Sequence, residues 1–110
     1  MKARSMTGDE LLRVFSAMAS PQRMRILAAL AEGGRNYVSQ LARDLDMNRP
    51  LLHMHLRRLE AAGLVLGTLE LSKDGKAMKY FEAAPFAIEL TPTSVREAVK
   101  TLTATEERPQ

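Results

Sequence analysis

The sequence has no cysteine and no tryptophan, and only 5% of its residues are aromatic. Without cysteine, the chain cannot form disulfides, thiolate metal sites, cysteine nucleophiles or thiol-based redox sensors. It also has no apolar run long enough for a signal peptide or a membrane span. We therefore expect a cytoplasmic protein that has no membrane partner.

The residues that are present have the composition of one small globular domain. Hydrophobic residues make up 45% of the 110 residues and charged residues 26%, which is typical of a folded chain. A chain of this length can bury one modest core. The net charge of +3 neither requires nor excludes nucleic acid, but the positive charge is concentrated. Residues 48–59 contain three arginines, both histidines and no acid.

Hydrophobic spacing predicts four helices before Gly63, over about residues 9–19, from Pro21 to Gly33-Gly34, and over about 37–46 and 49–62. The period then changes to that of strands over 64–71 and 77–83, and Asp74-Gly75 predicts a type I′ hairpin turn between them. Residues 86–90 are a candidate third strand. A last helix is expected over about 93–103, and 1–8 and 104–110 are expected to be a disordered lead and tail.

The predicted fourth helix has two chemically different faces. Leu52, Leu56 and Leu59 recur at spacings of four and three and form an apolar stripe. The opposite side carries cationic and hydrogen-bonding groups among its residues, which are Pro50, His53, Met54, Arg57 and Arg58. His55 lies on a flank, nearer the leucines. Such a helix can enter a DNA major groove, although a basic helix face is also commonly just solvated. The short helix before it, the charged hairpin after it and the lack of acids favour DNA.

These segments resemble the ArsR-type winged helix-turn-helix regulators. Residues 55–65, His-Leu-Arg-Arg-Leu-Glu-Ala-Ala-Gly-Leu-Val, match the family's signature, and residues 19–27 are similar to the entry into its second helix. Residues 40–45 are similar to its scaffold helix, and 74–76 with 80–81 to its wing. The resemblance implies an α+β winged helix, mostly helical, that acts as a dimeric, sequence-specific transcription factor, usually a repressor, whose outer helices form the dimer.

The sequence departs from the family's metal sensors. Where those proteins have cysteines on the scaffold helix, residues 41–44 are Leu-Ala-Arg-Asp, and the last helix contains no histidine. His53 and His55 would point about 200° apart on a helix, so they cannot chelate one ion. We expect no cofactor, no metal site and no specific response to zinc, nickel or arsenite, and the sequence identifies no effector. His53 also stands where the family often has serine, so operator preference cannot be carried over.

The sequence predicts a homodimer that binds double-stranded DNA and is not an enzyme, because no serine or acid has a catalytic arrangement. The residues expected at base edges are Arg49, His53 and Met54. Those expected at phosphates are Ser39, Gln40, Arg57, Arg58, Lys73 and Lys76. Asn48, as the helix cap, completes the DNA-binding set with His55, which is either a phosphate contact or a hydrogen-bonded flank.

The dimer interface is expected on the first and last helices, unless their apolar residues are ordinary core cover. Its expected anchors are Leu11, Leu12, Phe15, Val95, Val99 and Leu102. A winged helix that serves only as a protein–protein module is the alternative function, and it would have an apolar or acidic recognition face.

Overall fold

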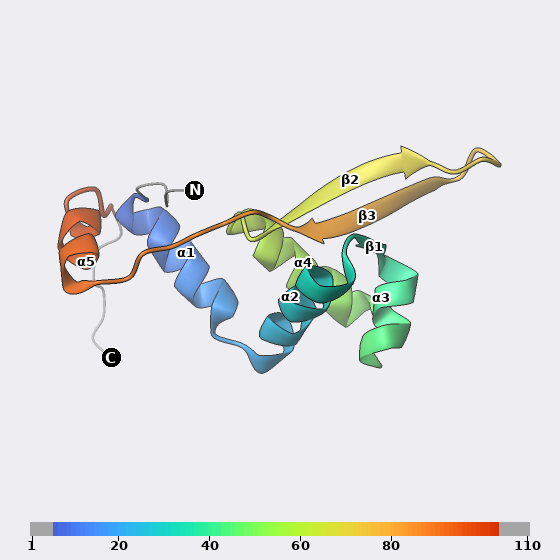
Figure 1. The fold of residues 1–110 in the computed structure, drawn as a ribbon, viewed down its shortest axis with the longest axis horizontal. Helices are drawn as coiled ribbons and strands as arrows, with labels where there is room; N and C mark the ends of the chain where they lie inside the picture. The colour runs from blue at the N-terminus through green and yellow to red at the C-terminus, as the bar shows by residue number, and fades with distance from the viewer. Residues whose placement is uncertain (1–5, 104–110) are drawn as a thin grey trace.

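The computed structural model describes residues 6–103, which form five helices and a three-stranded sheet (Figure 1). The helices are α1 (Gly8–Met18), α2 (Pro21–Gly33), α3 (Val38–Leu45), α4 (Arg49–Ala61) and α5 (Pro92–Val99). The strands are β1 (Asn36–Tyr37), β2 (Val65–Leu71) and β3 (Ala77–Ala83). The predicted α+β order of four helices, a hairpin and a last helix is confirmed.

The start of the first helix differs from the expectation that residues 1–8 form a lead. Thr7 caps α1, in a capping box with Glu10, and Gly8 is the first residue of the helix. Helix α1 therefore begins before Asp9, because the Thr7 hydroxyl accepts a hydrogen bond from an amide of the first turn. Residues 1–5 and 104–110 lie outside the described residues.

Local capping groups begin the second and fourth helices where the sequence predicted. The Ser20 hydroxyl accepts a hydrogen bond from the Arg23 amide, and Pro21 occupies the first turn of α2. The side-chain Oδ1 of Asn48 accepts from the Leu51 amide at 2.8 Å, which begins α4 at Arg49. Both caps satisfy amides that have no partner inside the helix.

The sheet is antiparallel with strand order β1-β3-β2, and its third strand is not the expected one. The two residues of β1 pair with Phe81 and Tyr80 of β3. Residues 86–90 form no strand and instead run as an extended segment between β3 and α5 (Figure 1). The prediction of a strand there was wrong because the free edge of β3 is taken by β1.

The hairpin turn also differs from the prediction. Gly75 has a φ of 85°, but Asp74 does not have a positive φ, and a type I′ turn needs positive φ at both central residues. The Gly75 amide donates to the Ser72 carbonyl at 2.9 Å. The connection is the predicted one, residues 72–76, but it contains a turn followed by one left-handed glycine instead of a type I′ turn.

The core is centred on α4. Leu52, Leu56 and Leu59 are all 0% exposed, and they pack in one cluster with side chains from α1, α2, α3 and the sheet. Ile26 and Leu41 are among these neighbours. Burying three leucine side chains contributes roughly 2 kcal/mol each, so this stripe fixes which face of α4 is turned outward.

Arg23 joins three helices at one point of the fold. From the first turn of α2, its Nε donates to the Ala17 carbonyl at 2.7 Å and its Nη2 to the Ser16 carbonyl at 3.4 Å, both in the last turn of α1. Its Nη1 lies 3.0 Å from Nδ1 of His55 on α4. One guanidinium thereby connects α1, α2 and α4.

His55 is an interior residue, which corrects one of the two roles expected for it. Its side chain is 4% exposed and bonded to Arg23, so it cannot serve as a surface phosphate contact. The hydrogen-bonded alternative describes its position. Burial, followed by the charges of Arg23 and Arg58, lowers the pKa of His55 below its ordinary value of 6.5.

The two ends of the described part of the chain are joined by hydrogen bonds between α1 and the residues after α5. The Gly8 amide donates to the Thr101 hydroxyl at 2.9 Å, and Thr103 donates to the Asp9 carboxylate through its amide and its hydroxyl. The approach is close, because a Cβ on Gly8 would lie 2.5 Å from the Ala98 carbonyl oxygen. Glycine at the start of α1 therefore allows α5 to pack on it.

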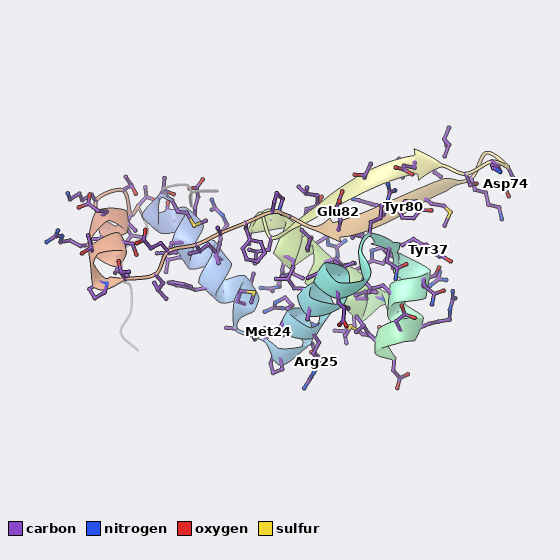
Figure 2. All side chains as sticks on the ribbon, in the orientation of Figure 1. Met24, Arg25, Tyr37, Asp74, Tyr80 and Glu82 are labelled. Atoms are coloured by element: carbon purple, nitrogen blue, oxygen red, sulfur yellow. The ribbon has the colours of Figure 1, made fainter. Side chains whose placement is uncertain are left out.

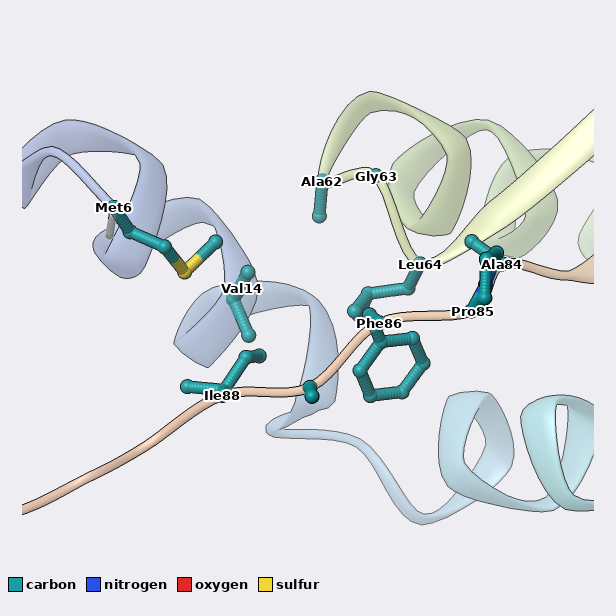
Figure 3. A pocket seen from close by; sticks show the side chains of 10 residues that line it. Met6, Val14, Ala62, Gly63, Leu64, Ala84, Pro85, Phe86 and Ile88 are labelled. Atoms are coloured by element: carbon teal, nitrogen blue, oxygen red, sulfur yellow. The ribbon is translucent and has the colours of Figure 1, made fainter. Parts of the chain in front are cut away.

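The extended segment that leads to α5 crosses α1 and leaves an apolar hollow beside it. Figure 3 shows Phe86 and Ile88 of this segment near Val14 of α1 and Leu64 at the start of the hairpin. The hollow has a volume of about 290 Å³ and is lined by apolar side chains. The segment thus covers part of the core before α5 returns to α1.

We expect Gly8→Ala to destabilise the fold by about 1–3 kcal/mol, because the added methyl group would overlap the Ala98 carbonyl and separate α5 from α1. Gly33→Ala is the matched control, since its Cβ would meet nothing within 4 Å and alanine favours helix by up to about 1 kcal/mol. Urea unfolding at one protein concentration measures both. Equal stability of Gly8→Ala and the wild type would contradict this packing.

The buried His55 predicts a loss of stability in mild acid. As the pH falls below about 6.5, the unfolded chain takes up a proton that folded His55 resists, so unfolding is favoured by up to about 1.4 kcal/mol per pH unit until the folded pKa is reached. His55→Asn keeps an acceptor near Nδ1 but does not titrate. Between pH 7.5 and 5.5 the wild type should lose more free energy of unfolding than this variant, and identical losses would refute the assignment.

Candidate nucleic-acid interface

The outward face of α4 carries most of the side chains that the sequence assigned to DNA. Arg49, Pro50, His53, Met54, Arg57 and Arg58 are all exposed. Among the described residues, none of the three arginines has a hydrogen-bond or ion-pair partner. This face is opposite the buried leucines, contains no acid between Arg49 and Arg58, and can donate hydrogen bonds to base edges and phosphates.

The turn between α3 and α4 brings three of the expected contacts together. Asp46 ends α3 in the left-handed conformation, with a φ of 54°, and only two residues separate it from Arg49. Ser39 of α3, Asn48 and Arg49 line one open hollow of about 410 Å³. Two short helices joined in this way form a helix-turn-helix, with α4 in the position of the recognition helix.

Gln40 is on the same helix as Ser39, but its side chain already has partners. Its amide nitrogen donates to the Asp44 carboxylate at 2.7 Å, and its amide oxygen accepts from Arg43 at 2.6 Å. Arg43, which also lines the hollow, was not among the contacts expected from the sequence. Its position three residues after Gln40 was the available signal, because residues at that spacing are neighbours on a helix.

The hairpin extends away from the helices and carries Lys73 and Lys76 at its exposed end (Figure 1). Asp74 lies between them, and its carboxylate accepts from the Ser72 hydroxyl, which lowers the pKa of Asp74. The acid therefore stays charged and offsets part of the positive charge at the tip. Lys79 lies further back, with its ammonium 5.3 Å from the centre of the Phe81 ring.

Side chains of β1 and the loop before it brace the hairpin on one face. Arg35 forms a 2.8 Å ion pair with Glu70, which raises the pKa of Arg35, and its guanidinium lies 4.2 Å from the centre of the Tyr80 ring. The Tyr37 and Tyr80 rings meet edge to face at 5.8 Å, and both are labelled in Figure 2. These contacts join the hairpin to β1, which leads directly into α3.

The expected dimer anchors divide into one buried residue and five exposed ones. Leu11 is buried within its own chain and therefore packs on the core of that chain, which corrects its assignment as a dimer anchor. The exposed apolar residues on α1, α5 and the turn after α5 are Leu12, Phe15, Val95, Val99 and Leu102. Because α1 and α5 pack side by side, their exposed apolar groups are candidates for one surface.

Two further features of the described residues bear on function. Within residues 6–103, no group of three or more histidine, aspartate or glutamate side chains is close enough to hold a metal ion. Over the same residues, no helix is both long and apolar enough to cross a membrane.

Comparisons with known proteins agree on one family. The pattern of the arsR family of bacterial regulatory proteins matches residues 20–66. The chain is 32% identical over 77 residues to an uncharacterized HTH-type transcriptional regulator of Methanocaldococcus jannaschii, an alignment that covers 70% of this chain and 79% of that protein. It is 39% identical over 75 residues to the HTH-type transcriptional regulator CmtR of Mycobacterium tuberculosis, over 68% of this chain and 59% of CmtR.

A similar solved structure is the homodimeric winged helix-turn-helix DNA-binding domain of a Mycobacterium bovis protein, with a TM-score of 0.61 and 26% identity. The match covers 84% of this chain and 74% of that one. These relatives are transcriptional regulators and not enzymes. The chain therefore belongs to the ArsR family of bacterial regulatory proteins, and it is a transcriptional regulator with a winged helix-turn-helix fold.

Proposed function

We propose that this regulator binds double-stranded DNA as a homodimer and represses transcription at a palindromic operator. The observation that carries the proposal is the division of α4 into a leucine face that is fully buried and an acid-free face whose three arginines are paired with no residue between 6 and 103. A helix fixed in this way can lie in the major groove with its N-terminal residues at the bases. Such a regulator would act in the cytoplasm, where prokaryotic DNA lies.

The residues along α4 have different expected roles. Arg49 and His53 lie one turn apart at the N-terminal end, which reaches deepest into the groove, and Met54 is beside them. Arg57 and Arg58 lie one to two turns further along, where phosphates are nearer. The residues that would contact phosphates on either side are Ser39, Gln40, Lys73 and Lys76. To do so, Gln40 would replace its hydrogen bond to Arg43 or Asp44 with one to the phosphate.

The dimer is proposed to form through α1 and α5. The homodimeric Mycobacterium bovis domain supports this state, and five exposed apolar residues on and beside these helices are suited to an interface. A two-fold dimer presents two copies of α4 in opposite directions, so its operator would be an inverted repeat. A protein–protein module is disfavoured because the exposed face of α4 is cationic.

Arg49→Ala should weaken binding to the operator by about 1–3 kcal/mol with little effect on random DNA, because a bidentate arginine–guanine contact discriminates between bases by that amount. Arg57→Ala should weaken both similarly and reduce the salt slope by about one unit per half-site, as expected for a phosphate contact. Titrations by fluorescence anisotropy at several salt concentrations measure both variants. Equal losses on operator and random DNA for Arg49→Ala would show that Arg49 also contacts only phosphate.

Introducing charge into the α1–α5 surface should dissociate the dimer. Val99→Glu places a carboxylate at a residue that is 56% exposed in the single chain, and burying it across an apolar interface should weaken association by about tenfold or more. Leu69→Glu on β2 is the matched control, because Leu69 is 68% exposed and lies on the hairpin. Sedimentation should show monomers for the first variant and dimers for the second, whereas dimers for both would refute this interface.

A further inference from the structure

The contacts of Arg23 are unusual because they join the end of one helix to the middle of another. The last carbonyls of a helix have no partner within it, and cations are favourable there. The last turn of α1 has no basic residue of its own. Arg23, which is on α2, supplies both a hydrogen-bond donor and a positive charge at the end of α1, since it donates to the Ser16 and Ala17 carbonyls.

The third contact of Arg23 defines the state of His55. A guanidinium can only donate, so Nδ1 of His55 must accept, and the ring proton must be on Nε2. Among the described residues, Nε2 is buried without a hydrogen-bond partner. A donor left in this way costs about 1–3 kcal/mol, which offsets what the hydrogen bond from the charged Arg23 contributes. Stability alone therefore gives no reason for a histidine here.

The position of the pair indicates what it does instead. His55 lies in the middle of α4, between the residues that would reach the bases and those that would reach phosphates. The carbonyls at the other end of the link belong to α1, which carries part of the candidate dimer surface. Because a guanidinium is planar and its donors are fixed in direction, three hydrogen bonds to it constrain the angle between α1 and α4.

We propose that Arg23 and His55 are positioning residues that fix the angle of α4 relative to α1, and thereby set the half-site spacing that the dimer accepts. This inference rests on the proposed function, because α1 must form the dimer and α4 must bind DNA. Within a symmetric dimer, any rotation of α4 against α1 is doubled between the two copies of α4. Changing the spacing by one base pair rotates one half-site against the other by roughly 35°.

The first test measures spacing preference with the full chain. The probes are the inverted repeat that the wild type selects from a random pool, the same repeat lengthened or shortened by one base pair, and a single half-site. The variants are Arg23→Met and His55→Leu. His55→Asn is the control for His55→Leu, because it retains an acceptor near Nδ1. Arg25→Met is the matched control for Arg23→Met, because Arg25 is an exposed arginine on the same helix as Arg23, α2, and is labelled in Figure 2.

Arg23→Met and His55→Leu should reduce the preference for the selected spacing by between about twofold and thirtyfold, with little change on the single half-site. His55→Asn and Arg25→Met should keep the wild-type preference. His55→Leu should also be about as stable as the wild type, because the lost hydrogen bond and the removed unpaired donor offset each other, and this separates positioning from stability. Unchanged spacing preference in both His55→Leu and Arg23→Met, or equal losses on every probe, would overturn the inference.

A second measurement needs neither DNA nor a dimer. Because the chain has no cysteine, spin labels can be attached at Arg13→Cys on α1 and Arg49→Cys on α4 of one chain, which is then diluted with unlabelled protein. The distance distribution between the labels should broaden or shift with Arg23→Met and stay as in the wild type with Arg25→Met. An unchanged distribution would refute the constraint itself, whereas failure of the wild type to bind any duplex would refute the proposed function instead.

Discussion

The burial of one leucine stripe determines what the rest of this structure can do. Leu52, Leu56 and Leu59 are fully enclosed by side chains from α1, α2, α3 and the sheet, so α4 cannot rotate about its axis without exposing them. Its opposite face is consequently fixed toward solvent with its arginines unpaired by any described residue. Capping by Asn48 then determines where this face begins, and the α3–α4 turn places Ser39 next to it.

The elements around α4 extend this constraint in two directions. On one side Arg35 and Tyr37 contact Glu70 and Tyr80 of the hairpin, which ties the hairpin to β1 and so to α3. On the other side Arg23 and the core residues connect α4 to α1, and α1 is joined to α5 through Gly8. Figure 1 shows the result, with the hairpin at one end of the molecule and α5 at the other. The candidate DNA and dimer surfaces are therefore separate parts of one packed unit.

Sequence reasoning predicted the elements whose signals are local. Ser20-Pro21 and Asn48-Arg49-Pro50 begin helices through their own side chains, and the strand-like runs around Asp74-Gly75 pair with each other across a short loop. It missed β1, because two residues carry no periodicity and their pairing depends on β3, more than forty positions away. It left the role of His55 open for the same reason, since only the fold brings Arg23 to its ring. Leu11 was misassigned because an amphipathic pattern does not show which apolar face the chain itself covers.

The central claim is that the exposed face of α4 binds the major groove of duplex DNA. Nitrogen-15 NMR of the full chain, titrated with the duplex it selects from a random pool, tests this claim most directly. The largest shifts are expected at the amides of residues 49–58, with smaller ones at residues 72–76 of the hairpin and little change along the exposed side of α1. Saturable binding that leaves the amides of α4 unchanged, or no binding to any duplex, would contradict it.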